Sequence, residues 1–120
     1  MTPQAKPTEH GVSPDYLLSD EFVLFIVRFG LRLTASHWGM SERTLRRLFH
    51  GLGTTSRAIV RDVRRREALR LLATDQPFPV VAGYLGFSSE KIFSRWVHQH
   101  FGETPTALRR SLIFSGGSTR

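Results

Sequence analysis

The sequence predicts an all-α protein of about seven helices, and three observations support that fold class. Apolar residues recur at three- and four-residue spacing through most of the chain between residues 13 and 112. Serine, threonine and proline stand where these segments begin, and glycine often follows where they end. The alternating pattern that strands show is almost absent. We therefore expect helices packed on helices, without a sheet.

The first helix is predicted to begin with Ser13 as its N-cap and Pro14 at its first position. Its apolar residues follow helical spacing as far as Gly30, which breaks the pattern. The run Phe22–Val27 is apolar on every side, so a buried strand is the alternative there. The apolar face of this helix is expected either to lie in the core or to be covered by another domain or a partner.

Two shorter helices are expected next, over about residues 31–38 and 42–50. The dipeptide Gly39-Met40 supplies the turn between them. Ser41 is the predicted N-cap of the second helix, because its hydroxyl can accept a hydrogen bond from a free amide of the first turn. Gly51 follows the last residue of that helix and is suited to end it.

A long helix over about residues 55–74 is expected to follow. The residues predicted to form its buried stripe are Ile59, Val60, Val63, Ala68, Leu71 and Leu72. Outside the predicted domain, residues 1–12 and 113–120 show no helical periodicity. They are expected to form a disordered arm and a flexible tail.

Three further helices are predicted in the second half of the chain. They are expected over about residues 79–85, 89–100 and 105–112. Ser88 is the predicted N-cap of the middle one, after a turn at Gly86 and Phe87. Thr104 and Pro105 begin the last one, since proline is tolerated in the first turn of a helix.

Length and cysteine content exclude several kinds of protein. A chain of 120 residues fits one domain and is short for a two-domain enzyme. Because it contains no cysteine, it has no disulfide, thiolate zinc site or thiol nucleophile. The longest apolar run has six residues, far below the roughly 20 that span a bilayer. We expect a cytoplasmic protein that does not enter a membrane and that binds no cofactor or metal.

The net charge of +7 is the first indication of a partner. Of the 17 basic residues, 15 are arginine, which makes forked contacts to phosphate and to guanine. Residues 41–70 hold nine arginines against three acidic residues. This concentration favours a polyanion as partner. The alternative is a solvated arginine-rich surface without a partner.

Two segments of the chain are alike. Residues 35–41 read Ala-Ser-His-Trp-Gly-Met-Ser, and residues 82–88 read Ala-Gly-Tyr-Leu-Gly-Phe-Ser. Both segments have the pattern Ala-x-x-apolar-Gly-apolar-Ser, and a predicted helix with interleaved basic and apolar residues follows each. A small alanine, a turn glycine and a capping serine suit two helices that meet at a sharp angle. The repeat therefore predicts two helix-turn-helix subdomains, joined by the long linker helix.

The length of the predicted linker helix suggests how the two units could bind one DNA molecule together. About 20 residues of helix rise roughly 30 Å, and one turn of B-DNA is about 34 Å. A spacer of that length could place two recognition helices in successive major grooves of double-stranded DNA. One chain would then read an asymmetric site without dimerising, so we expect a monomeric DNA-binding domain.

Over about residues 31–110, these motifs resemble the DNA-binding domain of the AraC/XylS family of bacterial transcription regulators. The strongest part of the resemblance is the segment Val81–Ser88, followed by Phe93-Ser-Arg, Phe101-Gly-Glu-Thr-Pro and Leu108-Arg. The first unit is less typical, with Thr34 where an aliphatic residue is usual and Trp38 where leucine is usual. The resemblance implies an asymmetric promoter site and a contact with RNA polymerase.

The resemblance also indicates which residues meet DNA. Carried over position by position, the candidates for reading bases are Arg43, Arg46, Arg47, Glu90, Lys91, Ser94 and Arg95. The candidates for phosphate contacts are Ser41, Thr44, Ser88, Ser89 and Arg64. Arg46 and Arg95 are expected to read bases about one helical turn apart. The alternative for each of these residues is a solvated helix face or a cap.

An enzyme is not expected, since the sequence has no paired-carboxylate motif, glycine-rich phosphate loop or metal cluster. The rival functions are a protein-interaction module and a nucleic-acid binder without sequence preference. The family's larger effector domain is not in this sequence. The chain therefore fits either a short regulator or the C-terminal piece of a longer one.

Overall fold

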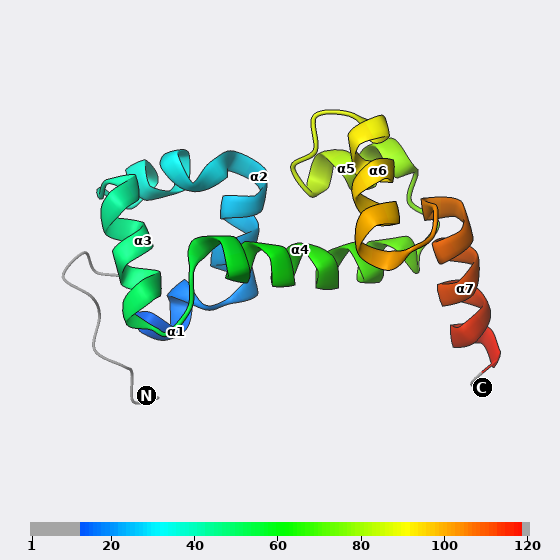
Figure 1. Ribbon diagram of the computed structural model, residues 1–120, viewed down its shortest axis with the longest axis horizontal. Coiled ribbons are helices and arrows are strands. Elements are labelled where there is room, and N and C mark those ends of the chain that lie inside the picture. Colours follow the sequence, from blue (N-terminus) through cyan, green and yellow to red (C-terminus); the bar gives the residue numbers. More distant parts are fainter. Residues whose placement is uncertain (1–12, 119–120) are drawn as a thin grey trace. The chain divides into compact units, whose positions relative to one another are not determined.

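The structure, a computed structural model, describes residues 13–118, and within them the chain forms seven helices and no strand (Figure 1). This confirms the predicted all-α class. The helices are α1 (Pro14–Leu17), α2 (Asp20–His37), α3 (Glu42–Gly51), α4 (Ser56–Leu72), α5 (Phe78–Tyr84), α6 (Glu90–Phe101) and α7 (Pro105–Ser118). None of these helices is long and apolar enough to cross a membrane. The arm predicted over residues 1–12 lies outside the described residues.

The chain divides into two compact units, and the boundary between them falls at Val63 and Arg64, inside α4. The first unit contains α1, α2, α3 and the first half of α4. The second contains the rest of α4 together with α5, α6 and α7. Each unit has its own buried cluster of apolar side chains.

The first unit begins with two helices where the periodicity predicted one. Ser13 caps α1 as expected, since its Oγ accepts a hydrogen bond from the Tyr16 amide at 3.1 Å. Ser19, however, ends α1 and starts α2: its hydroxyl donates to the Tyr16 carbonyl at 2.7 Å and accepts from the Phe22 amide at 3.2 Å. The prediction of one unbroken helix over this segment is therefore wrong. The apolar spacing continues across Ser19, so it does not reveal the break.

A kink at Gly30 divides α2, at the position where the sequence predicts a break. The backbone of Gly30 has φ 89° and ψ 159°, a conformation that is essentially open only to glycine. Phe22–Val27 lies in the helix before the kink, so the alternative of a buried strand is wrong. After the kink, Thr34 is fully buried, and its hydroxyl donates to the Gly30 carbonyl at 2.8 Å. The buried hydroxyl of Thr34 therefore has its hydrogen-bond acceptor at the kink, in the carbonyl of Gly30.

The core of the first unit is formed where α2 packs on α3. Its buried members are Leu17, Phe22, Ile26, Ala35, Met40, Leu45 and Phe49. The indole of Trp38 packs against this cluster, 5.6 Å from the Tyr16 ring and 6.0 Å from the Phe22 ring. The apolar face of α2 is therefore mainly core, although Phe29 and Leu33 remain 48% and 62% exposed.

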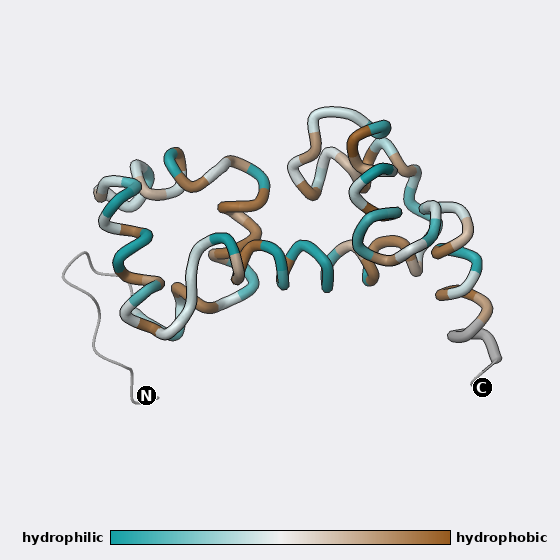
Figure 2. The backbone as a smooth tube through the Cα atoms, in the orientation of Figure 1, coloured by the Kyte–Doolittle hydropathy of each residue, from teal (hydrophilic) through white to brown (hydrophobic). Residues whose placement is uncertain are grey.

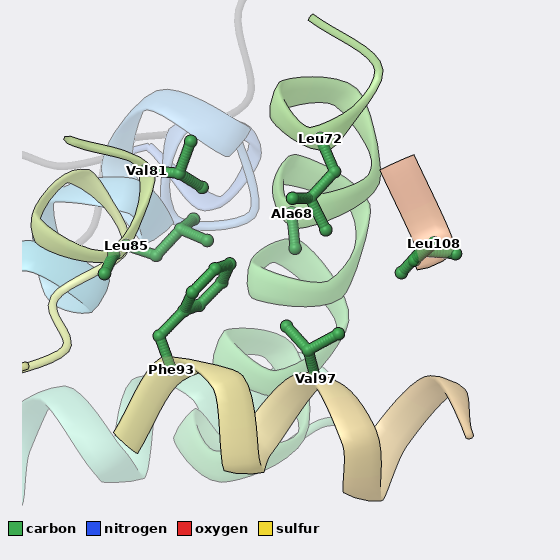
Figure 3. Close-up of a cluster of buried hydrophobic side chains, with 8 residues drawn as sticks. Ala68, Leu72, Val81, Leu85, Phe93, Val97 and Leu108 are labelled. Carbon is green, nitrogen blue, oxygen red and sulfur yellow. The ribbon is translucent and has the colours of Figure 1, made fainter. Parts of the chain in front are cut away.

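The core of the second unit joins the end of α4 to α5, α6 and α7 (Figure 3). Its buried members are Ala68, Leu72, Val81, Ala82, Leu85, Phe93, Val97 and Leu108. Figure 3 shows the Phe93 ring pointing from α6 toward Leu85 and Val81 of α5 and toward Ala68 of α4. The apolar residues before and after the second turn thus hold α6 on α5.

Helix α4 is shorter than predicted, with 17 residues that correspond to about 25 Å of rise. Val63, Ala68 and Leu72 of the predicted stripe are buried, whereas the other three members are only half-buried. Figure 2 shows mainly hydrophilic residues in the middle of this helix. The linker is therefore a largely polar helix that contributes apolar residues to a core near each end.

Helix α7 continues to Ser118 instead of ending near residue 112, so the predicted flexible tail is helical over residues 113–118. Arg109 fixes its first turns within the second unit. The guanidinium Nε donates to the Leu72 carbonyl at 3.1 Å, and Nη2 donates to the Gln76 carbonyl at 2.6 Å. The same guanidinium lies 4.4 Å from the centre of the Phe78 ring. Arg109 thereby satisfies a carbonyl at the end of α4, where the helix leaves it without an internal partner.

Candidate nucleic-acid interface

Each unit contains a pair of helices joined by the same sharp turn. In the first unit, the Met40 amide donates to the Ala35 carbonyl at 3.0 Å. In the second, the Phe87 amide donates to the Ala82 carbonyl at 2.9 Å. The glycine inside each turn has a left-handed backbone, with φ of 73° and 86° respectively. These are Schellman turns, and they explain why alanine, glycine and an apolar residue recur at this spacing.

The two units differ in the residue that starts the next helix. Ser41 caps α3 as predicted, because its Oγ accepts from the Thr44 amide at 3.0 Å. In the second unit the cap is Ser89, whose Oγ accepts from the Ile92 amide at 3.2 Å. The prediction of Ser88 as the cap is wrong, because the second turn contains one more residue. The sequence repeat aligns Ser88 with Ser41, whereas the capping geometry aligns Ser89.

This extra residue changes which side chains of α3 and α6 are equivalent. Counted from the caps, Leu45 corresponds to Phe93, and Phe49 corresponds to Val97; all four side chains are buried. The equivalent outward positions are then Glu42 and Glu90, Arg43 and Lys91, Arg46 and Ser94, Arg47 and Arg95, and His50 and His98. The candidates that the resemblance indicates occupy the first four of these five positions in α6, and three of those four positions in α3. Arg47 and Arg95 are the one arginine pair that the two helices share among these positions.

A capping test separates the two serines. Ser89→Ala is expected to lower the free energy of unfolding by about 1 kcal/mol, because the Ile92 amide loses its acceptor. Ser88→Ala is the matched control and should change it by less than about 0.5 kcal/mol, since Ser88 is exposed and makes no capping bond in the described structure. Urea unfolding of the two variants measures the difference. Equal losses, or a larger loss for Ser88→Ala, would contradict the capping geometry.

The candidates in the first unit form an exposed basic face on α3. Arg43, Arg46 and Arg47 are all exposed, on the side of the helix away from buried Leu45. The Arg46 guanidinium pairs with the Glu42 carboxylate at 2.5 Å, and both side chains remain accessible to solvent. An exposed pair of this kind contributes about 0–1 kcal/mol. The Arg46 side chain can therefore exchange Glu42 for a phosphate or a base at little cost.

The candidates in the second unit form a less basic face on α6. Glu90, Lys91 and Arg95 are exposed, and Ser94 is half-buried. Ile92, which is not among the candidates from the sequence, is also 43% exposed. The available signal was its spacing of three residues from Arg95, which predicts a shared outer stripe instead of a place in the core. The outer face of α6 thus combines two cations, one carboxylate and an apolar side chain.

Three of the four hydroxyl groups predicted to contact phosphate already take part in hydrogen bonds at the start of a helix. Ser41 and Ser89 act as caps, and the Ser41 hydroxyl also lies 3.0 Å from the Thr44 hydroxyl, to which it donates. The first amides of α3 and α6 add partial positive charge at the same helix ends, and that charge suits an anion. Phosphate contact by these groups stays a prediction.

Arg64 packs inside the second unit. Its guanidinium lies 4.9 Å from the centre of the Phe87 ring, and its Nε is buried without a hydrogen-bond partner among the described residues. Burial lowers the pKa of the Arg64 guanidinium, because desolvation disfavours the charged form. The side chain thus supports the turn before α6. A phosphate contact by Arg64 was predicted and stays a prediction for its remaining N–H groups.

Several other charged residues of α4 contact a neighbouring residue of the helix or an aromatic ring of the second unit. Arg61 pairs with Asp62 at 3.2 Å. Glu67 pairs with Arg70 at 2.6 Å. Arg65 lies over the Phe101 ring at 5.1 Å. The basic run on this helix is therefore partly structural, and the outward cations that remain exposed on α3 and α6 form the better candidate interface.

The geometry defines a double helix-turn-helix protein, since each unit presents the second helix of such a motif with its basic side chains exposed. Residues 34–111 match the family model described as a helix-turn-helix domain. A solved AraC-type DNA-binding transcriptional regulator from Chromobacterium violaceum is 27% identical, with a TM-score of 0.56 over 77% of this chain and 89% of that one. The chain belongs to the AraC-type helix-turn-helix family, whose members are DNA-binding transcription regulators.

Two characterised regulators are also similar to this chain. The ornithine utilization regulator of Pseudomonas aeruginosa is 39% identical over 72 residues, which are 59% of this chain and 21% of that protein. The transcriptional activator NphR of a Rhodococcus species is 40% identical over 73 residues, or 60% of this chain and 22% of that protein. The chain thus spans about a fifth of the length of these relatives.

Proposed function

We propose that this chain is a sequence-specific DNA-binding domain whose helices α3 and α6 enter successive major grooves of an asymmetric promoter site. The observation that carries the proposal is the matched register of the two helices. Arg47 and Arg95 occupy the same position after their caps, and both are exposed. Arginine at the outer face of a recognition helix can donate two hydrogen bonds to guanine O6 and N7.

The chemical difference between the two helices supports an asymmetric site. The outer face of α3 carries three arginines, whereas that of α6 carries Lys91, Ile92 and Arg95. Two faces with different donors and apolar groups select different bases, so a palindrome would satisfy only one of them well. One chain with two unlike reading helices does not need a second copy. We infer that the domain binds as a monomer.

The linker is consistent with this mode of binding. Its 17 residues give about 25 Å of helix, to which the turns at both ends add further length. Neighbouring major grooves on one face of B-DNA lie about 34 Å apart. Helix α4 contributes apolar residues to the core of each unit.

The names of two relatives suggest the role of DNA binding by this chain. One is named as an activator and the other as a regulator of ornithine utilization. We propose that this chain likewise directs transcription, with RNA polymerase as a second partner.

The salt dependence of duplex binding tests the proposal. A duplex is first selected from a random pool with the purified chain, and its affinity is then compared with that of a scrambled duplex. A domain that touches about 6–10 phosphates should lose roughly 10³–10⁵ in affinity between 50 and 200 mM salt. It should also prefer the selected duplex by roughly 10³ or more. Footprinting should show two protected segments about 10 base pairs apart.

Three results would contradict the proposal. Steep salt dependence without sequence preference would indicate a binder of nucleic acid in general. An absence of duplex binding at 50 mM salt would favour the protein-interaction module. A single protected segment, or a symmetric footprint filled by two copies, would exclude two-groove reading by one chain.

A further inference from the structure

Ile92 is an apolar side chain in an unusual place. It lies at the third position of α6 and is 43% exposed, the one large apolar residue of this helix that is exposed to that degree. Phe93 and Val97, which hold α6 in the core of the second unit, are fully buried on the other side of the helix. The side chain of Ile92 is therefore not required to close the core.

The position of Ile92 places it among the candidate DNA contacts. Residues three and seven positions apart on a helix share one stripe, so Ile92 lies in line with Arg95 and Gln99. Lys91 precedes it on the same exposed side. If α6 presents Lys91 and Arg95 to a major groove, the Ile92 side chain meets the edges of the bases between them.

The equivalent position in the first unit differs in one chemical respect. Thr44 stands there, half-buried, and its hydroxyl oxygen already accepts a hydrogen bond from Ser41. Ile92 has no polar atom beyond the backbone, so it cannot donate to phosphate or to a base. The one apolar feature that a major groove offers is the C5-methyl group of thymine.

We propose that Ile92 is a specificity-determining residue, which reads thymine through its methyl group in the half of the site that α6 occupies. The inference rests on the proposed function, since it requires α6 to enter a major groove. It specifies which base is preferred at one position of the site. A base that places a polar group against the Ile92 side chain would be disfavoured, because that group would lose its hydrogen bonds to water.

The experiment removes one methyl group from the DNA. Each thymine of the selected duplex is replaced in turn by deoxyuridine, which keeps the base pair and lacks only the C5-methyl group. Binding is measured for the wild-type chain and for Ile92→Ala at one fixed salt concentration. One replacement within the α6 half-site should weaken wild-type binding about threefold to fivefold, the effect of exposing one methyl-sized apolar group. The same replacement should change binding by Ile92→Ala less than about 1.5-fold.

Two further variants control for the change of side chain. Val80 is 54% exposed on α5 of the same unit, so Val80→Ala removes exposed apolar surface from a different helix. It should keep the full wild-type sensitivity to deoxyuridine. Ile92→Thr introduces the residue of the first unit and retains one methyl group, so it should keep part of that sensitivity.

The outcomes separate this inference from the function on which it rests. If the chain prefers its selected duplex but no deoxyuridine replacement weakens binding, or if Ile92→Ala is equally sensitive, Ile92 does not read thymine and the proposed function stands. A selected site without thymine in the α6 half would have the same meaning. If the chain shows no sequence preference, the proposed function and this inference fail together.

Discussion

Arg95→Ala is expected to weaken binding to the selected duplex by about 1–3 kcal/mol, through the loss of a forked contact to guanine in the half-site of α6. The discrimination against other bases at that one position should fall by a similar amount. The guanidinium is exposed at the sixth position after the Ser89 cap, so its removal leaves the core of the second unit intact. Competition binding with a duplex substituted at each position measures both quantities.

Arg47→Ala is the equivalent change in α3 and should have an effect of similar size about one helical turn away, in the other half-site. Arg46→Ala is expected to cost less, because Arg46 corresponds to Ser94, so the two helices do not share an arginine at that position. This ordering follows from the structural register and differs from the expectation from the sequence, which paired Arg46 with Arg95.

Arg110→Ala provides the control for loss of charge. Arg110 is exposed on α7, away from both candidate helices in the sequence, and its removal changes the net charge by the same amount. It should alter the affinity slightly and the base preference not at all. The two-groove model is wrong if Arg47→Ala and Arg95→Ala relax preference at the same base, or if neither does.

Phe93→Ala should have the largest effect on stability. Its ring is fully buried, 5.5 Å from the Phe87 ring and 6.5 Å from the Trp96 ring. Removing a buried phenylalanine ring costs about 3–5 kcal/mol, a large share of the 5–15 kcal/mol that typically stabilises a domain. The second unit should be largely destabilised, while the first keeps its own buried cluster. Amide hydrogen exchange should therefore accelerate in α5 and α6 far more than in α3.

Phe114→Ala is the matched control, because Phe114 is 77% exposed on α7. It should change the free energy of unfolding by less than about 0.5 kcal/mol. Uniform acceleration of exchange in both units by Phe93→Ala would show that the two units unfold together. Protection of α5 and α6 at the wild-type level would contradict the assignment of Phe93 to the core.

The sequence alone determined the helical class, the two turn motifs and the basic residues that follow them. It could do so because these features depend on neighbours within about seven residues: helical spacing of apolar groups, a glycine with positive φ, and a serine beside a free amide. Ser41 shows this well, because its cap and the helix after it were predicted and are observed. The family resemblance was confirmed for the same reason, since its motifs are local strings.

The tertiary structure decided which serine caps α6, where α1 gives way to α2, and what the arginines do. Ser88 and Ser89 are both acceptable caps by sequence, and the choice between them depends on how Phe93 packs against α4 and α5. Arg64 was predicted to contact phosphate, yet its guanidinium lies over the Phe87 ring, and that of Arg109 lies over the Phe78 ring, both distant in the chain. The physical reason is that a local pattern specifies how a segment folds, whereas the partner of a long side chain depends on segments that only the fold brings near. In this protein the packing of α6 determines that Ser89 is its cap, and the cap in turn makes Arg95 the equivalent of Arg47.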